Sequence, residues 1–214
     1  MSINLKKRIY TSIILFLIIY LIISFNFFLL FILIVLGNLS ILEFFNISKR
    51  IIKNKFNLFF INTIFSLYIF LFCILFFYFS NILYLKIILF SLLFGCIASD
   101  VGGYVFGKLF KGPKLTKISP KKTITGSIGS IIFTIVIITF LFFYITNSFS
   151  YYSIIIAILT SLSCQVGDLF FSYLKRKAKI KDTGNFLPGH GGILDRLDGI
   201  LLAIPLSVLS LTLF

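Results

Sequence analysis

Seven long, mostly apolar stretches follow one another along this chain and constrain its fold more than any other feature. A transmembrane helix needs about 20 apolar residues, with a range of about 17 to 25. Backbone polar groups in lipid must be paired within the protein, so such stretches form helices. The predicted spans cover residues 9–24, 25–45, 57–79, 82–99, 127–146, 151–173 and 199–214. We therefore predict an all-α, polytopic membrane protein with about seven transmembrane helices, although the first two stretches could instead form one long tilted helix.

The composition excludes a soluble globular domain. Hydrophobic residues make up 59% of the chain and charged residues 12%, whereas a soluble domain carries about 25% charged residues. A chain this apolar cannot cover a surface that faces water, so its main solvent is lipid.

Basic residues mark one side of the predicted membrane topology. With seven spans, every lysine and arginine except Lys86 falls on the same side. Since cytoplasmic loops carry the excess of Lys and Arg, we predict a cytoplasmic amino terminus and an external carboxyl terminus. Two long loops, 101–126 and 175–198, then face the cytoplasm. We divide the chain into amino-terminal transmembrane helices, 1–99, and a membrane domain, 100–214, that contains both loops and carries the function.

The chain has six acidic residues, and five of them lie in or beside these two loops. Acids are costly near a bilayer and tend to be functional there. Alternatively, they only neutralise the many lysines. Asp195 and Asp198 are three residues apart, so a helix places them on one face. Two carboxylates on one face suit a hard divalent cation such as Mg²⁺.

A glycine-rich turn, Pro188-Gly189-His190-Gly191-Gly192, precedes this acidic pair. Glycine can adopt positive φ and approach a ligand closely, and successive N–H groups in such a turn form an anion-binding concavity. The start of the following helix adds its positive end. The surrounding basic residues are Lys175, Arg176, Lys181 and Arg196. The alternative is a plain glycine-rich turn, but the flanking charges favour a site for phosphate and a metal ion.

The other long loop contains lysines, hydroxyls and glycines near the end of a span. Ser119, Lys121, Lys122 and Thr123 can bind phosphates through point charges and hydrogen bonds. A solvated basic loop that contacts anionic lipid headgroups would show the same residues. The spacing alone favours neither interpretation.

Several of these residues together carry a family resemblance. The longest pattern consists of Ser172, Lys175-Arg176, Lys181-Asp182, the turn 188–192 and Asp195-Arg196-Leu197-Asp198. Shorter blocks are Gly167-Asp168-Leu169, Ser119-Pro120-Lys121-Lys122-Thr123, and Asp100 with Tyr104 and Gly107. From about residue 100 to the end, the chain thus resembles the phosphatidate cytidylyltransferases, also called CDP-diacylglycerol synthases.

The chain departs from that signature in places. Thr125 and Phe171 stand where the family usually has glutamates, and Gly103 stands for an alanine. The stretch between Glu43 and Asp100 is much shorter than in typical members, as though about two helices were absent.

The resemblance implies transfer of a cytidylyl group from CTP to phosphatidate, which yields CDP-diacylglycerol and pyrophosphate for phospholipid biosynthesis. It also implies Mg²⁺, leaves open a second, monovalent cation and a homodimer, and gives no reason to expect a nucleic-acid partner. The implied catalytic residues are Asp168, Lys181, Asp182, His190, Asp195, Arg196 and Asp198, of which Asp168, Asp195 and Asp198 would bind the metal. The implied substrate-binding residues are Asp100, Tyr104, Ser119, Lys121, Lys122, Thr123, Ser172, Lys175, Arg176, Gly189, Gly191 and Gly192.

Three alternatives remain on the sequence. A CTP-dependent polyprenol or phytol kinase would also bring a nucleotide to a membrane lipid, but it should lack the complete long pattern. A small membrane transporter would show ionisable residues in mid-span and broken helices in matched halves, whereas the first three spans contain no charge in their interiors. An inactive homologue would be consistent with the two absent glutamates.

Overall fold

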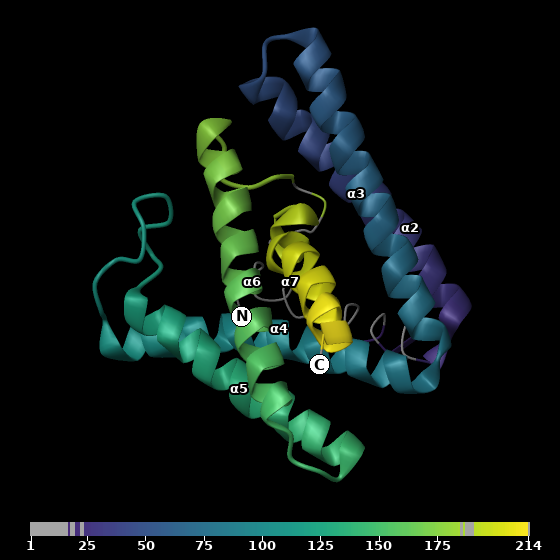
Figure 1. The fold of residues 1–214 in the computed structure, drawn as a ribbon. Coiled ribbons are helices and arrows are strands. Elements are labelled where there is room, and N and C mark those ends of the chain that lie inside the picture. The colour runs from purple at the N-terminus through teal and green to yellow at the C-terminus, as the bar shows by residue number, and fades with distance from the viewer. Residues whose placement is uncertain (1–16, 18–19, 22–23, 185, 187–190, 214) are drawn as a thin grey trace, which may run out of the picture. The chain divides into compact units, whose positions relative to one another are not determined.

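The computed structural model describes residues 17, 20–21, 24–184, 186 and 191–213. Within them the chain folds into helices (Figure 1). The helices are α2 (Asn26–Ile51), α3 (Lys55–Asn81), α4 (Leu83–Phe110), α5 (Ile124–Thr146), α6 (Tyr151–Lys177) and α7 (Leu194–Leu213). Short connections join α2 to α3, α3 to α4, and α5 to α6. The all-α prediction is therefore confirmed, whereas the predicted first span, 9–24, lies almost entirely outside the described residues.

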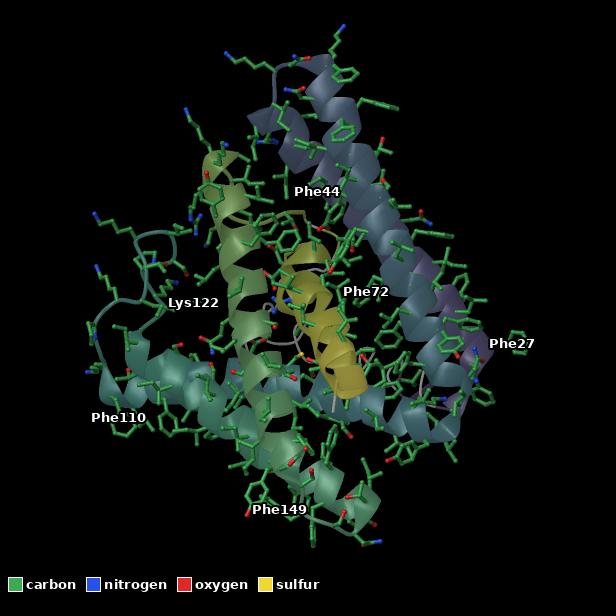
Figure 2. The ribbon with its side chains drawn as sticks, viewed as in Figure 1. Phe27, Phe44, Phe72, Phe110, Lys122 and Phe149 are labelled. Atoms are coloured by element: carbon green, nitrogen blue, oxygen red, sulfur yellow. The ribbon has the colours of Figure 1, made fainter. Side chains whose placement is uncertain are left out.

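Five helices, α2 to α6, are long and apolar enough to cross a membrane. Large apolar side chains lie on their outer faces; Phe27 of α2, for example, is 90% exposed and points away from the ribbon (Figure 2). Helix α7 contains Pro205 and, over its described residues, is not among these five. The chain is thus a membrane protein, as predicted, while the count of about seven spans and the orientation stay predictions.

The chain divides into two compact units. The first combines Met1–Asn81 with Leu174–Leu197, and the second combines Ile82–Tyr173 with Asp198–Phe214. Residues 99 and 100, between which the sequence predicts a domain boundary, both belong to α4, and that division of the chain stays a prediction. Contacts between distant segments, and not the order of the chain, therefore define the units.

In the first unit, α2 and α3 run antiparallel and lie side by side (Figure 1). Gly37 lies where these helices approach each other, and a Cβ at this position would lie 3.2 Å from Ile69 Cγ2 and 3.3 Å from the Cys73 sulfur. Nearer to the connection between the helices, Phe44 (labelled in Figure 2) stacks on Phe65 with ring centroids 3.8 Å apart. This packing fixes the end of α2 that carries Glu43, the residue before Phe44.

In the second unit, glycines bring the backbones of α4 and α5 into contact. A Cβ at Gly102 would lie 2.5 Å from the Gly129 carbonyl oxygen, and a Cβ at Gly126 would lie 2.8 Å from the Gly103 carbonyl oxygen. Small residues at helix interfaces are typical of membrane proteins, because dispersion forces and not the hydrophobic effect hold the helices together there. Any larger side chain at these positions would separate the two helices.

Helix α4 is consequently longer than the sequence predicts. It continues to Phe110, so the connection to α5 covers 111–123, whereas the sequence predicts a loop over 101–126. The difference arises because the glycines that indicate a loop in the sequence serve instead as contact residues between helices. The other connection, 178–193, falls within the predicted loop 175–198.

Candidate active site

A cavity of about 360 Å³ lies in the second unit, where α4, α5 and α6 meet the connection 111–123. It is lined by Ser99, Asp100, Gly103, Tyr104, Leu115, Ser119, Lys121, Lys122, Thr123, Gly126, Ser127, Ser130, Gln165 and Asp168. Seven of these are predicted site residues, namely Asp100, Tyr104, Ser119, Lys121, Lys122, Thr123 and Asp168. The fold thus brings together three motif segments that are distant in the sequence.

Lys122 and Asp168 form an ion pair in this cavity. Their side chains are 28% and 29% exposed, so solvent reaches the pair. Ser172, one turn after Asp168 on α6, donates a hydrogen bond of 3.3 Å to Asp168 Oδ1. Figure 2 shows Lys122 on the connection that leads into α5. Because a lysine ammonium is a compact charge on a flexible stem, Lys122 can exchange this carboxylate for a bound anion.

The connection that carries Lys122 is held in place by hydrogen bonds of its own. An isolated β-bridge joins Lys114 to Thr123, and the Leu115 amide donates to the Lys122 carbonyl oxygen at 2.8 Å. The Thr123 hydroxyl accepts from the Gly126 amide at 3.0 Å and so caps the first turn of α5. The two lysines before this cap therefore lie next to a helix start, whose positive end attracts anions.

Hydroxyl and amide groups that belong to no sequence motif form a polar network in the wall of the cavity. Gln165 Nε2 donates to the Ser127 carbonyl oxygen at 3.3 Å and to Ser161 Oγ at 3.2 Å. Ser99 and Ser161 share a hydrogen bond of 3.2 Å, and Ser130 donates to the Ser99 carbonyl oxygen at 2.7 Å. A satisfied buried network of this kind rigidifies its surroundings. Isolated serines and one glutamine inside apolar spans were the only sequence signal for it.

Helices α6 and α7 cross in the second unit at two glycines. A Cβ at Gly167 would lie 2.6 Å from the Asp198 carbonyl oxygen, and a Cβ at Gly199 would lie 2.6 Å from the Cys164 sulfur. Asp168 and Asp198, both predicted metal ligands, each adjoin one of these glycines. The crossing therefore brings two acidic positions to one region. Among the described residues of either unit, no three His, Cys, Asp or Glu side chains are grouped to hold a metal ion.

In the first unit, Asp195 is the centre of a hydrogen-bonded cluster. Its Oδ1 accepts from Lys175 Nζ at 2.7 Å, and its Oδ2 accepts from the Thr183 amide at 2.8 Å and the Gly192 amide at 3.0 Å. Burial raises the pKa of Asp195, but the Lys175 ammonium and the two amides outweigh burial and lower this pKa below its ordinary value. Both carboxylate oxygens thus have protein partners, and Asp195 joins the end of α6 to the connection before α7.

A second carboxylate, that of Glu43 on α2, contacts the same connection and is only 1% exposed. It accepts hydrogen bonds from the Thr183 hydroxyl at 2.6 Å, the Ile193 amide at 3.0 Å and the Leu194 amide at 2.9 Å. These partners lie at least 140 positions later in the chain. The sequence could therefore not show what Glu43 binds, although Glu43 is an isolated acid near the end of an apolar stretch and Glu43-Phe44 resembles an amino-terminal mark of the resembled family.

Of the other predicted residues of the first unit, four are exposed, Gly191 is half-buried and two fall outside the described residues. The exposed ones are Arg176, Lys181, Asp182 and Arg196. Gly191 has φ +84°, and a Cβ at this position would lie 3.1 Å from Asp195 Oδ2 and 3.8 Å from Asp182 Oδ1. Glycine is required there because side chains rarely adopt such a φ. Gly189 and His190 lie outside the described residues.

The two positions where the resembled family has glutamates belong to local packing. The Thr125 hydroxyl shares a hydrogen bond of 3.1 Å with the Thr123 hydroxyl and accepts from the Gly112 amide at 3.3 Å. Phe171 is 5% exposed, and its ring makes a T-shaped contact with Phe170. Neither position lines the cavity.

Comparison with known proteins gives matches that agree with one another. A family model described as "Cytidylyltransferase family" matches residues 51–214. Proteins named phosphatidate cytidylyltransferase are similar to the chain: that of Rickettsia bellii is 43% identical over 125 residues, which is 54% of this chain and 54% of the relative. The protein of Mycobacterium bovis is 43% identical over 127 residues, 58% of this chain and 41% of the relative, and that of Staphylococcus haemolyticus is 44% identical over 110 residues, 50% and 42% respectively. The chain spans about half the length of the first of these curated relatives.

Proposed function

Because the chain belongs to the cytidylyltransferase family, we propose that it transfers a cytidylyl group from CTP to phosphatidate, which forms CDP-diacylglycerol and pyrophosphate. The observation that carries this proposal is the cavity in which the ion pair of Lys122 and Asp168 adjoins Asp100 and the block 119–123. The reaction is the one that the relatives' shared name states, and the charged groups that line the cavity support it.

The size and the lining of the cavity support a phosphate-bearing substrate. Its volume of about 360 Å³ falls within the range of about 300 to 1,000 Å³ that is usual for small-molecule sites. Lys121 and Lys122 would neutralise phosphate oxygens, while Ser119 and Thr123 would donate hydrogen bonds. Phosphoryl-group chemistry depends mainly on positioning and charge stabilisation, and requires little covalent participation by the protein.

The proposed reaction balances without a strong general base. A phosphate oxygen of phosphatidate attacks the α-phosphorus of CTP and forms a new P–O bond. The bond from the α-phosphorus to the oxygen that bridges to the β-phosphorus breaks, and this oxygen leaves with pyrophosphate. Since the attacking oxygen is already anionic, the protein has to bring two anions together. Lys122 would leave Asp168 and bind a phosphate group, which removes part of their mutual repulsion.

Asp168 and Asp198 are the residues that we propose for Mg²⁺. Carboxylate oxygens are ligands that this ion accepts, and both acids adjoin the glycine crossing of α6 and α7. The bound ion would neutralise charge on the triphosphate. The oxygens of Asp195 are engaged by Lys175 and by backbone amides. Its assignment as a third metal ligand stays a prediction, and we propose for it a role in holding the connection before α7.

We further propose that the cavity faces the cytoplasm of a bacterial inner membrane and that the chain has seven spans. The lysines of 111–123, together with Lys179 and Lys181 of 178–193, support this orientation, and CTP would enter from that side. A reporter fused after Phe214 should read as extracytoplasmic, whereas one inserted in 111–123 should read as cytoplasmic. A cytoplasmic signal after Phe214 would contradict the seven-span topology.

The activity can be tested with purified protein in detergent, with radiolabelled CTP, phosphatidate and Mg²⁺. We expect labelled CDP-diacylglycerol and an equal amount of pyrophosphate. Release of CDP together with a phosphorylated lipid alcohol, when polyprenol or phytol is supplied, would indicate a kinase instead. The absence of any lipid product would contradict the proposed function.

A matched pair of variants tests whether the cavity is the site. Lys122→Met removes the ammonium that pairs with Asp168, and we expect kcat/KM to fall about a hundredfold, equivalent to about 2.7 kcal/mol of transition-state stabilisation. Lys117→Met removes an exposed lysine of the same connection that does not line the cavity, and its activity should stay within about twofold. Equal losses in the two variants would show that only the total charge of the connection matters.

A further inference from the structure

Glu43 lies at an unusual place for a carboxylate. It is 1% exposed, and its three donors are a hydroxyl and two backbone amides, which are all uncharged. Two of these donors, the amides of Ile193 and Leu194, lie at the start of α7. The first amides of a helix have no partner within the helix, and the positive end of the helix dipole stabilises an anion there. Glu43 thus caps the first turn of α7 from a different helix.

The connection before α7 is held between Glu43 and Asp195. Thr183 donates its hydroxyl to Glu43 and its amide to Asp195. Gly192 donates its amide to Asp195, and a Cβ at this position would lie 2.5 Å from Glu43 Oε2. A Cβ at Gly184 would lie 2.6 Å from Glu43 Oε1. The Glu43 carboxylate therefore leaves no room for a side chain at Gly184 or Gly192. Thr183 is hydrogen-bonded to both acids.

We infer that Glu43 is a positioning residue for catalysis: it holds residues 183–184 and 192–193 and the first turn of α7 in the conformation in which Asp195 binds Lys175. The inference rests on the proposed function, since the basic and acidic groups of this segment are those of the predicted phosphate site. Glu43 itself would not contact substrate. It acts through Thr183 and the start of α7.

The inference can be tested with Glu43→Gln. A glutamine has one acceptor oxygen where Glu43 uses two, and its amide group would face a backbone amide or the Thr183 hydroxyl. We expect hydrogen exchange of the Ile193 and Leu194 amides to accelerate at least tenfold, with amides in the middle of α4 unchanged. We also expect kcat to fall at least tenfold at a temperature well below thermal unfolding. A role in stability alone would lower the unfolding temperature and leave kcat of the folded enzyme unchanged.

A milder pair of variants keeps the test decisive if Glu43→Gln does not fold. Thr183→Val removes one hydrogen bond to Glu43, whereas Thr183→Ser keeps the hydroxyl. We expect Thr183→Val to lower kcat and to accelerate exchange of the same two amides, and Thr183→Ser to restore both. Normal kcat in Thr183→Val, or exchange of these amides that is unchanged, would overturn the inference. Hydrogen exchange is measured without substrate, so its result does not depend on the proposed function. If the wild-type protein formed no CDP-diacylglycerol, the proposed function would be contradicted. Accelerated exchange in the variants would still show that Glu43 holds this segment.

Discussion

The ion pair between Lys175 and Asp195 should contribute more to stability than a surface salt bridge. The two charged atoms are 2.7 Å apart, and the side chains are 11% and 10% exposed. Lys175→Met removes the ammonium and keeps a helix-forming side chain of similar length at the end of α6. Asp195→Asn removes the negative charge and keeps the shape of the carboxyl. The two changes and their combination form a double-mutant cycle that isolates the pair.

The expected magnitude follows from burial and from the other partners of Asp195. Exposed ion pairs contribute about 0.2 to 1 kcal/mol, and breaking a fully buried pair costs about 3 to 5 kcal/mol. This pair retains about a tenth of its exposure, and the carboxylate keeps the amides of Thr183 and Gly192. We therefore expect Lys175→Met to lower the free energy of unfolding by about 2 to 3 kcal/mol, with a coupling energy of about 1.5 to 2.5 kcal/mol.

Equilibrium denaturation in detergent micelles, followed by far-ultraviolet circular dichroism, measures these free energies for the four proteins. Lys179→Met is the matched control, because it removes an exposed positive charge from the same region and should change the free energy of unfolding by no more than about 0.5 kcal/mol. A coupling energy below about 0.5 kcal/mol would refute the reasoning, since the pair would then behave like one in open solvent.

Two further predictions concern the same segment. Gly192→Ala should destabilise the protein by about 2 to 3 kcal/mol, because the new Cβ would overlap Thr183 and Glu43. The control, Gly37→Ala, should be nearly neutral, because its Cβ would meet only side-chain atoms and alanine has the higher helix propensity. Similar unfolding midpoints for the two variants would contradict this prediction. Because the pKa of Asp195 is lowered in the folded protein, its contribution should be complete above about pH 4 and be lost as the pH falls through the lower folded pKa. The stability difference between wild type and Asp195→Asn should hence be constant from pH 7 to about pH 4 and shrink below; a decrease that begins near pH 6 would contradict the lowered pKa.

Much of the cavity could be predicted from the sequence, because its chemistry lies in short blocks. The block 119–123 and the acids at 100 and 168 are each recognisable from their neighbours, and the structure places them around one cavity. Gln165 and Ser127 could not be found in this way. A polar side chain in an apolar span becomes informative only when the opposite helix shows what it binds.

The extent of α4 illustrates why glycines are ambiguous in a membrane protein. Gly102 and Gly103 interrupt the apolar pattern, so the sequence indicates a loop. In the fold they allow α4 to approach the backbone of α5 at Gly126 and Gly129. A glycine can serve a turn or a close helix contact, and only the presence or absence of the opposite helix distinguishes the two.

The sequence by itself determined the solvent of this protein, its helical class and the chemistry of its motifs, because these depend on composition and on spacing over a few residues. Only the tertiary structure decided where the helices end, which motif blocks share a cavity and which acid caps α7. Glu43 and Leu194 are 151 positions apart, and their contact exists because packed helices brought them together. Burial then makes that contact necessary, since neither the carboxylate nor the first amides of α7 can find water in its place.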